Sequence, residues 1–218
     1  RMKKKGVKAR FVRGGSTKYL VEMLNEGLTD YILDGQTFDL YGVGSMRDNP
    51  RHVATSPFTS YNYNGKGFFG TMLDAVVLGA TEVDVNFNAN VVTHSDGRLL
   101  HGIGGWQNCL FSNCTILAVP SVRDRIPVIV DEVTTLTGPG ELIDVVATER
   151  GLCINPKRKD LLDAVKGSGL PIKDIRELQK ETYDICGGKP NPPKRSEEPV
   201  AVVKWVDGTV IDSVWKIK

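Results

Sequence analysis

The spacing of apolar residues predicts a strand, a helix and a strand near the start of the chain. Residues 17–26 carry apolar side chains at helical spacing, and the pattern stops at Gly27. This segment lies between two short strand candidates at residues 8–12 and 31–33, the second of which is closed by an Asp-Gly turn. The order predicts a βαβ unit. A second helix is predicted at residues 39–47, and a polar, aromatic loop follows it.

The middle of the chain is rich in predicted strands. Residues 73–80 form a nearly unbroken apolar run bounded by glycine, which is typical of a strand buried on both faces. Residues 82–87 alternate between apolar and polar side chains, which predicts a half-exposed strand. Further strands are expected at residues 91–93, 114–119, 128–130, 133–136 and 143–147.

The last third predicts two helices, a linker and a hairpin. Helices are expected at residues 159–166 and 174–186, and Gly187 and Gly188 end the second. Residues 187–199 are rich in proline and glycine, as a linker is. In residues 200–218, Asp-Gly at 207–208 separates two strand candidates, which predicts a tight β-hairpin. The expected organisation is therefore an α/β domain over 1–186, a linker over 187–199 and a hairpin over 200–218.

The predicted hairpin contains two of the three tryptophans, Trp205 and Trp215. A hairpin on its own is marginally stable in water. We therefore expect these two side chains to hold it against the main body or against a partner subunit.

Composition narrows the possible functions. The chain has 218 residues, 40% of them hydrophobic and 25% charged, and a formal net charge of +2, which is typical of a globular protein. Basic and aromatic residues are not interleaved as in a nucleic-acid-binding surface. No apolar stretch reaches the roughly 20 residues of a membrane span, and Lys3 to Lys5 precede no signal-peptide core, so we expect a cytoplasmic protein. The four cysteines form no zinc-binding pairs and are predicted to be free thiols.

Short catalytic and nucleotide-binding motifs are missing from the sequence. The glycines at 102, 104 and 105 lack the spacing of a dinucleotide-binding fingerprint. The sequence contains neither a Walker motif nor a Gly-x-Ser-x-Gly elbow. His52, His94 and His101 have no evident serine or cysteine partner, so each is interpreted as a hydrogen-bonded loop or surface residue.

Longer strings, spread over nearly the whole chain, carry a resemblance. They are residues 14–18 (GGSTK), 33–36 (LDGQ), 73–84 (LDAVVLGATEVD), 86–91 (NFNANV), 95–97 (SDG), 104–105 (GG), 125–135 (RIPVIVDEVTT), 138–140 (GPG), 144–146 (DVV), 148–151 (TERG), 155–156 (NP) and 206–212 (VDGTVID). Together they resemble the α subunit of citrate lyase. Members of that family are much longer, and this chain resembles their C-terminal half.

The resemblance implies a fold, an activity and partners. The fold would be a CoA-transferase-like α/β domain with a mainly parallel or mixed sheet, followed by the hairpin. The activity would be that of a citrate CoA-transferase, which moves citrate onto the thioester of coenzyme A or of an acyl-carrier prosthetic group. These thioesters are substrates, and neither a tightly bound cofactor nor a metal is expected. The partners would be the β and acyl-carrier subunits of citrate lyase in a multisubunit complex, with homo-oligomerisation, and no nucleic acid or membrane.

The glycine pair provides the candidate catalytic groups. Gly104 and Gly105 could direct backbone N–H groups at the oxyanion that forms on a thioester carbonyl, or could simply permit a tight loop. Many relatives read His-Gln-Asp or His-Cys-Asp after this pair, where this chain has Trp106, Gln107 and Asn108. The difference removes an imidazole and a carboxylate that could orient citrate or move a proton. Gln107 is retained as a candidate substrate contact.

Further substrate-binding candidates are polar residues in loops and at strand ends. They are Ser60, Asn62, Asn86, Asn88 and Arg98, each of which could instead serve a turn or a solvated surface. Arg123 and Arg125 could also bind carboxylates or the phosphates of coenzyme A, although solvated arginines are commoner.

The mechanism that the resemblance implies is a ternary complex without a covalent enzyme intermediate. Related covalent CoA-transferases carry a glutamate after an early strand, where this chain has Arg13, Gly14, Gly15 and Ser16. The alternative is that Glu82 or Glu132 reaches the cleft from another strand. Because only one half of a two-domain cleft is matched, the 218 residues by themselves are expected to show no turnover. A different class of function, a structural or assembly module, also stays open.

Overall fold

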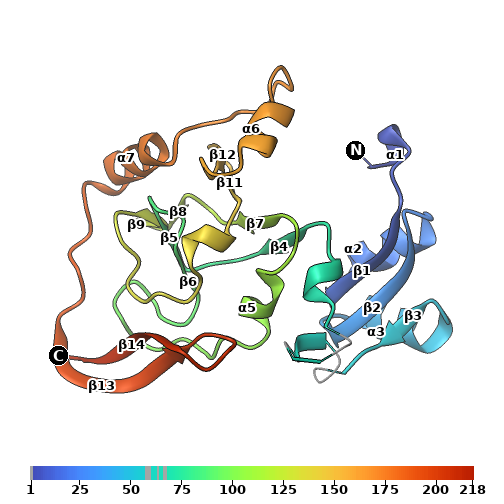
Figure 1. Ribbon diagram of the computed structural model, residues 1–218, viewed down its shortest axis with the longest axis horizontal. Coiled ribbons are helices and arrows are strands. Elements are labelled where there is room, and N and C mark those ends of the chain that lie inside the picture. Colours follow the sequence, from blue (N-terminus) through green and yellow to red (C-terminus); the bar gives the residue numbers. More distant parts are fainter. Residues whose placement is uncertain (1, 57–59, 63, 66–67) are drawn as a thin grey trace. The chain divides into compact units, whose positions relative to one another are not determined.

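The computed structural model describes residues 2–56, 60–62, 64–65 and 68–218. The chain divides into two compact units, Arg1–Phe69 and Gly70–Lys218. Both contain helices and strands, which confirms the predicted mixed α/β class (Figure 1).

The first unit is a three-stranded parallel sheet with helical connections. Its elements are α1 (Met2–Lys5), β1 (Ala9–Ser16), α2 (Lys18–Asn25), β2 (Thr29–Thr37), α3 (Leu40–Asp48) and β3 (His52–Ala54), and the strands lie in the order β1-β2-β3 (Figure 1). The predicted βαβ unit is confirmed, because β1 and β2 pair in parallel and α2 connects them along the chain. Leu24 and Ile32 are fully buried between helix and sheet, as the apolar spacing requires.

Asp39 fixes the start of both main helices of this unit. Its carboxylate caps α3 by accepting a hydrogen bond from the Gly42 backbone N–H at 2.8 Å. The other carboxylate oxygen accepts from the backbone N–H of Lys18, the first residue of α2, at 2.7 Å. These two bonds lower the pKa of Asp39.

The second unit contains a four-stranded mixed sheet, a three-stranded sheet and two hairpins. Its strands are β4 (Val76–Leu78), β5 (Glu82–Asp84), β6 (Ala89–Asn90), β7 (Thr115–Ala118), β8 (Val122–Arg123), β9 (Ile126–Pro127), β10 (Ile129–Val130), β11 (Val145–Thr148), β12 (Gly151–Ile154), β13 (Arg195–Lys204) and β14 (Val210–Ile217). The sheet orders are β12-β11-β7-β4 and β10-β5-β6, and the hairpins are β8-β9 and β13-β14. The helices are η1 (Gly70–Met72), α5 (Trp106–Cys109), η2 (Gly140–Leu142), α6 (Lys159–Ala164) and α7 (Ile175–Cys186).

The C-terminal hairpin belongs to the core of this unit. Val203 and Val214, one from each strand, are buried in the same apolar cluster as Leu117 and Leu178. Trp205 packs against the cluster, with its ring centroid 5.9 Å from that of Phe111, as predicted for a residue that holds the hairpin in place. In Figure 1, α7 and the hairpin lie on opposite sides of β5 and β6.

Two predicted strand environments are wrong. Within residues 73–80 only β4 is a strand, and it lies at a sheet edge with Val77 65% exposed, so it is not buried on both faces. Within residues 82–87 the strand β5 is buried along its whole length, since β10 and β6 flank it. The strand ends before Phe87, whose φ of 68° cannot continue it.

Two further predicted strands do not form, because side chains accept hydrogen bonds from their backbone N–H groups. At residues 91–93, the Asn90 side chain accepts hydrogen bonds from the N–H groups of Val92 and Thr93. At residues 133–136, the N–H of Thr134 donates to Glu82 and that of Leu136 donates to Asp212. These segments fold as loops held by carboxylates and an amide.

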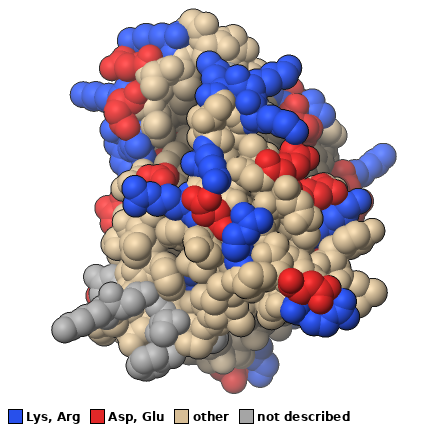
Figure 2. Space-filling view, turned by 90° about the vertical axis from the view of Figure 1, so that its right-hand side faces the viewer, with Lys and Arg blue, Asp and Glu red and all other residues tan. Residues whose placement is uncertain are grey.

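The surface charge is mixed. On the face drawn in Figure 2, basic side chains (blue) lie among acidic ones (red). Among the helices of the described residues, none has the length and hydrophobicity needed to cross a membrane. Within the same residues, no three His, Cys, Asp or Glu side chains are grouped so that they could hold a metal ion.

Candidate functional site

Gly104 and Gly105 form the turn that leads into α5. Gly104 has φ of +59°, a left-handed conformation that favours glycine, and no atom lies within 4 Å of the position that a Cβ would take. Gly105 is the residue immediately before α5. The conformation therefore explains one of the two glycines, and the space beside Gly104 is open to another group.

The side chains of α5 anchor this turn. Trp106 donates its indole N–H to the carbonyl of Gly79 at 2.9 Å. Gln107 is 4% exposed and donates its amide Nε2 to the carbonyl of Thr137 at 2.9 Å. The side chains of Trp106 and Gln107 are thus engaged in holding the helix. Gln107 as a substrate contact stays a prediction, and a ligand could reach it only if this bond were exchanged.

The turn at residues 138–140 joins α5 to the loop after β5. A Cβ on Gly138 would lie 2.5 Å from the ring of Trp106, and a Cβ on Gly140 would lie 2.0 Å from the carbonyl oxygen of Asn86. The backbone N–H of Gly140 donates to the Asn88 side chain at 2.8 Å. Four of the candidate residues, Gly104, Gly105, Asn86 and Asn88, therefore lie in segments packed around one turn.

Asp84 organises the loop that carries Asn86 and Asn88. This 1% exposed carboxylate accepts hydrogen bonds from the backbone N–H groups of both residues, at 2.8 and 3.0 Å, and from the Asn88 side chain at 3.0 Å. Burial raises the pKa of Asp84, although these hydrogen bonds act in the opposite direction. Asn88 is therefore committed to the loop. Asn86 is exposed, and its side chain makes no hydrogen bond within the described part of the chain.

The charged candidates are dispersed. Arg98 is exposed, and its Nε lies 3.7 Å from the carboxylate of Asp96 in the same turn. Arg123 donates to the backbone carbonyls of Ala80 and Thr81, which is a structural use of its guanidinium. Glu82, named from sequence as an alternative nucleophile, is buried and accepts hydrogen bonds from Asn90 and Thr134.

Ser60 and Asn62 belong to the first unit. Ser60 is 2% exposed and donates its hydroxyl to Thr55, while Asn62 accepts a hydrogen bond from the backbone of Asn64. Both bonds are those of a turn. Part of the predicted polar loop, residues 57–59 and 63, lies outside the described residues.

Sequence reasoning missed a buried serine, aspartate and histidine in the first unit. His52 Nε2 lies 3.1 Å from the Asp34 carboxylate and 3.3 Å from the Ser16 hydroxyl, and its Nδ1 lies 3.0 Å from the Ser45 hydroxyl. In a hydrolytic triad the serine and the aspartate contact opposite nitrogens of the ring. Here both contact Nε2 and Ser16 is fully buried, so the group ties the carboxyl ends of β1 and β2 to β3. A serine partner for His52 becomes visible only when the parallel strands are placed side by side.

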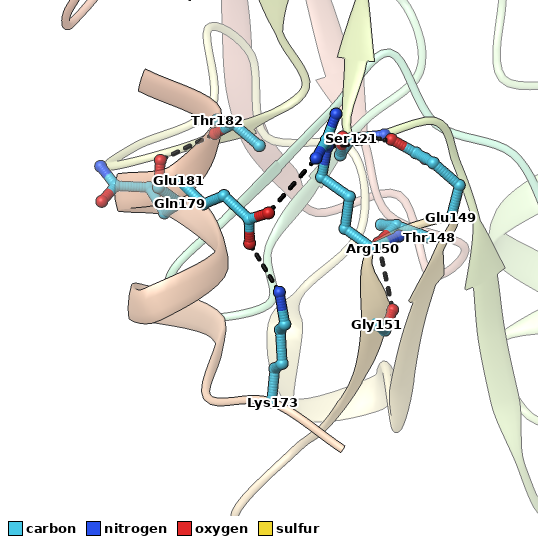
Figure 3. A network of polar contacts seen from close by, with 9 residues as sticks. All are labelled: Ser121, Thr148, Glu149, Arg150, Gly151, Lys173, Gln179, Glu181 and Thr182. Carbon is cyan, nitrogen blue, oxygen red and sulfur yellow. Dashed lines mark hydrogen bonds and ion pairs between the residues drawn. The ribbon is translucent and has the colours of Figure 1, made fainter. Parts of the chain in front are cut away.

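A second polar network links α7 to the β11–β12 turn (Figure 3). Arg150 donates to the Ser121 hydroxyl at 3.0 Å and to Glu181 at 3.3 Å, and Lys173 donates to the other Glu181 oxygen at 2.6 Å. Glu149 accepts both the backbone and the hydroxyl donor of Ser121. Because each acceptor here is satisfied by a donor from a neighbouring element, we interpret the network as structural.

Comparison with known proteins identifies the family. The fold and the glycine turn define a mixed α/β protein with an open backbone turn beside an asparagine-bearing loop. A family model described as citrate lyase, alpha subunit, matches residues 1–217, and the chain belongs to that family. The resemblance read from the sequence is thereby confirmed.

Individual relatives agree along the whole chain. The citrate lyase alpha chain of Haemophilus influenzae is 38% identical over 219 residues, which cover all of this chain and 44% of that protein. The citrate lyase alpha chain of Klebsiella pneumoniae is 37% identical, with 43% of it covered. A structure from Streptococcus mutans, described as the α subunit of citrate lyase in complex with citrate, is 39% identical with a TM-score of 0.94, and 43% of it is covered. The chain thus spans less than half the length of these relatives.

Proposed function

We propose that this chain forms part of a citrate CoA-transferase of the citrate lyase α type. The observation that carries the proposal is the similarity to citrate lyase alpha chains along all 218 residues, together with the similarity to a structure in complex with citrate. The substrates would be citrate and an acetyl thioester of an acyl-carrier protein or coenzyme A. The protein would act with β and acyl-carrier subunits in the cytoplasm and would form homo-oligomers.

The proposed reaction proceeds through an acid anhydride. A citrate carboxylate attacks the acetyl thioester carbonyl, the C–S bond breaks, and the thiolate leaves with acetyl citrate anhydride as the other product. The thiolate then attacks the citryl carbonyl of the anhydride, which gives the citryl thioester and releases acetate. Each attack develops negative charge on a carbonyl oxygen, so the site must hold a multiply charged acid and stabilise an oxyanion.

The turn at Gly104 and Gly105 is the proposed oxyanion site. Backbone N–H groups stabilise a developing oxyanion best when they are already in place before the reaction. The left-handed Gly104 and the bonds of Trp106 and Gln107 hold the turn in one arrangement. Asn86 offers an exposed amide for a citrate oxygen from a loop packed against the same 138–140 turn.

A ternary complex without a glutamyl intermediate fits the residues at hand. The end of β1 has Arg13, Gly14, Gly15 and Ser16, none of which can form a thioester through a carboxylate. Glu82 is buried and accepts hydrogen bonds from Asn90 and Thr134, which leaves it poorly placed to attack a thioester. Glu132 is exposed and is the alternative nucleophile to be tested.

Acetyl transfer to citrate by the full-length protein is the direct test. Transfer should be lost in Gly105→Val and retained in Gly102→Ala, where no atom lies within 4 Å of the new Cβ. Circular dichroism separates lost chemistry from lost folding, and full activity of a folded Gly105→Val would exclude the oxyanion role.

Incubation with acetyl-coenzyme A, borohydride reduction and peptide mass mapping should reveal no glutamate converted to its alcohol. A reduced Glu132 would exclude the ternary mechanism. The 218 residues by themselves should show no turnover.

One observation favours a second candidate function, a non-catalytic assembly module. Trp106, which by the sequence resemblance stands where many relatives have histidine, uses its indole N–H for a structural bond to the Gly79 carbonyl. If the full-length protein lacks transfer activity yet assembles with β and acyl-carrier subunits, this second function is the correct one. Transfer activity in the wild-type protein excludes it.

A further inference from the structure

Arg13 lies at the end of the first sheet where α/β proteins bind ligands. It is on β1, three residues before that strand ends, and β1, β2 and β3 are all parallel. Ligands of such sheets bind outside the carboxyl ends of the strands. At this edge the register shifts: Gly14 pairs with Asp34 and Gly15 with Gln36, which leaves Gly35 as a bulge. Bulges of this kind are frequent beside functional sites, where they redirect side chains.

The Arg13 guanidinium lies over two aromatic rings, and two of its nitrogens have no hydrogen-bonding partner among the described residues. Its Cζ lies 4.8 Å from the centroid of the Tyr61 ring and 5.1 Å from that of Phe69. Nε and Nη2 are buried and have no hydrogen-bond partner among the described residues. Cation–π contacts compensate part of the lost hydration, but unsatisfied buried N–H groups of a cation remain costly. An acceptor supplied by a ligand would remove that cost.

The unpaired edge of Arg13 is the one that other arginines of this chain present to carboxylates. Arg47 binds the two carboxylate oxygens of Asp48 through Nε and Nη2, both at 2.7 Å. Arg158 binds Asp160 through the same two nitrogens at 2.9 and 2.7 Å. A guanidinium presents this pair of N–H groups as a planar fork that matches a carboxylate. In Arg13 the fork is complete and unoccupied by the described residues.

No neighbouring carboxylate of the described sheet edge competes for this fork. Asp34, the nearest acidic residue along β2, accepts hydrogen bonds from Thr37, Gln36 and His52. Gly35 faces the Nη2 end of the guanidinium, since a Cβ there would lie 4.0 Å from Nη2 and 3.5 Å from the Tyr61 hydroxyl oxygen. A carboxylate presents two coplanar oxygens to such a pair of N–H groups, which gives the bidentate geometry.

We infer that Arg13, whose guanidinium lies over the rings of Tyr61 and Phe69, is a binding residue for one carboxylate of a small polycarboxylic acid, held bidentately through Nε and Nη2. The inference deepens the proposed function, on which it rests for citrate as the probe. It places a substrate subsite in the first unit, independently of the glycine turn in the second.

Calorimetric titration of citrate into the full-length protein tests the inference. Arg13→Gln should raise the Kd for citrate at least tenfold, and Arg13→Lys should also weaken binding, because an ammonium group cannot form the bidentate pair. The matched control is Arg10→Gln, an exposed arginine of the same strand, which should bind citrate as the wild type does. Inorganic phosphate should not compete.

Each outcome decides the matter. Unchanged citrate binding in Arg13→Gln, absence of citrate binding by the wild type, or competition by phosphate would overturn the carboxylate subsite. Arg13→Met provides a second measurement, since replacing an unpaired buried cation by an apolar side chain should raise the thermal unfolding midpoint without citrate and abolish its rise with citrate. If every Arg13 variant fails to fold, Arg13 is a structural residue and the inference is wrong. Citrate binding is measured without turnover, so the test separates this subsite from the proposed reaction. If the wild-type protein is inactive but binds citrate, and Arg13→Gln loses that binding, the proposed reaction is wrong and the subsite is supported.

Discussion

Gly140→Ala should destabilise the second unit strongly, because backbone surrounds this glycine. The new Cβ would lie 2.0 Å from the carbonyl oxygen of Asn86 and 2.9 Å from the backbone nitrogen of Asn88, and neither atom can rotate away. Relief requires the 138–140 turn to move, which strains two hydrogen bonds of Gly140, one to Asn88 at 2.8 Å and one from Asn155 at 2.9 Å.

The magnitude follows from these contacts. Overpacking costs about 1–3 kcal/mol, and two weakened hydrogen bonds add about 2 kcal/mol. Replacing glycine restricts the unfolded chain and returns about 0.4–1 kcal/mol. The net loss is therefore about 2–4.5 kcal/mol, a large part of the roughly 5–15 kcal/mol that stabilises a domain.

Urea unfolding followed by tryptophan fluorescence measures this loss in the correct part of the chain. All three tryptophans, at positions 106, 205 and 215, belong to the second unit. With a slope of about 2 kcal/mol per molar urea, the midpoint should fall by roughly 1–2 M. Gly102→Ala is the control, since no atom lies within 4 Å of its Cβ, and its midpoint should stay close to wild type. Equal midpoints for Gly140→Ala and Gly102→Ala would refute the reasoning.

Three further predictions concern buried polar groups. Burial opposes ionisation of Asp34, but hydrogen bonds from Thr37 and His52 outweigh the effect of burial and lower the pKa of Asp34. The stability gained from this carboxylate is therefore present above the pKa of an unfolded aspartate, about 3.9, and is lost as the pH falls below that value. Thermal unfolding followed by circular dichroism should show this acid loss in the wild type and less of it in Asp34→Asn, and identical pH profiles would contradict the prediction. Burial raises the pKa of Cys153 to about 12, so a thiol reagent at neutral pH should label the same number of cysteines in folded wild type and folded Cys153→Ser. Asn155→Ala should cost about 2 kcal/mol in urea unfolding, because the buried amide donates to the carbonyls of Gly140 and Ile143; a change within measurement error would show that these carbonyls find other donors.

Local patterns were sufficient for the elements whose partners are close in sequence. The βαβ unit, α7 with its left-handed Gly187 and the Asp-Gly hairpin all formed as predicted, because capping residues and apolar spacing determine them locally. Exposure along β4 and β5 depends on which strands flank them, and no local pattern contains that information. The loops at 91–93 and 133–136 likewise depend on side-chain acceptors, one of them Asp212, far along the chain.

The candidate site shows the same division. The glycine pair was recognisable from sequence because a left-handed turn requires glycine at position 104. The commitment of Gln107 to the Thr137 carbonyl and of Asn88 to Gly140 was not recognisable, since each bond joins segments at least thirty residues apart. Arg13 was noted in the sequence only as a residue unable to form a thioester. Its unpaired Nε and Nη2 become apparent only in the structure, where the guanidinium lies over the rings of Tyr61 and Phe69.

The burial of Val203 and Val214 has a consequence for synthesis on the ribosome. The first unit is contiguous in sequence, so its three strands can pair as soon as residues 1–69 have emerged. The second unit cannot close its apolar cluster until the hairpin, the last part of these 218 residues to be translated, has been added. Until then the apolar side chains that pack against the hairpin region, Phe111 among them, stay exposed. A nascent chain that pauses before Arg195 would therefore expose an apolar surface to which chaperones can bind.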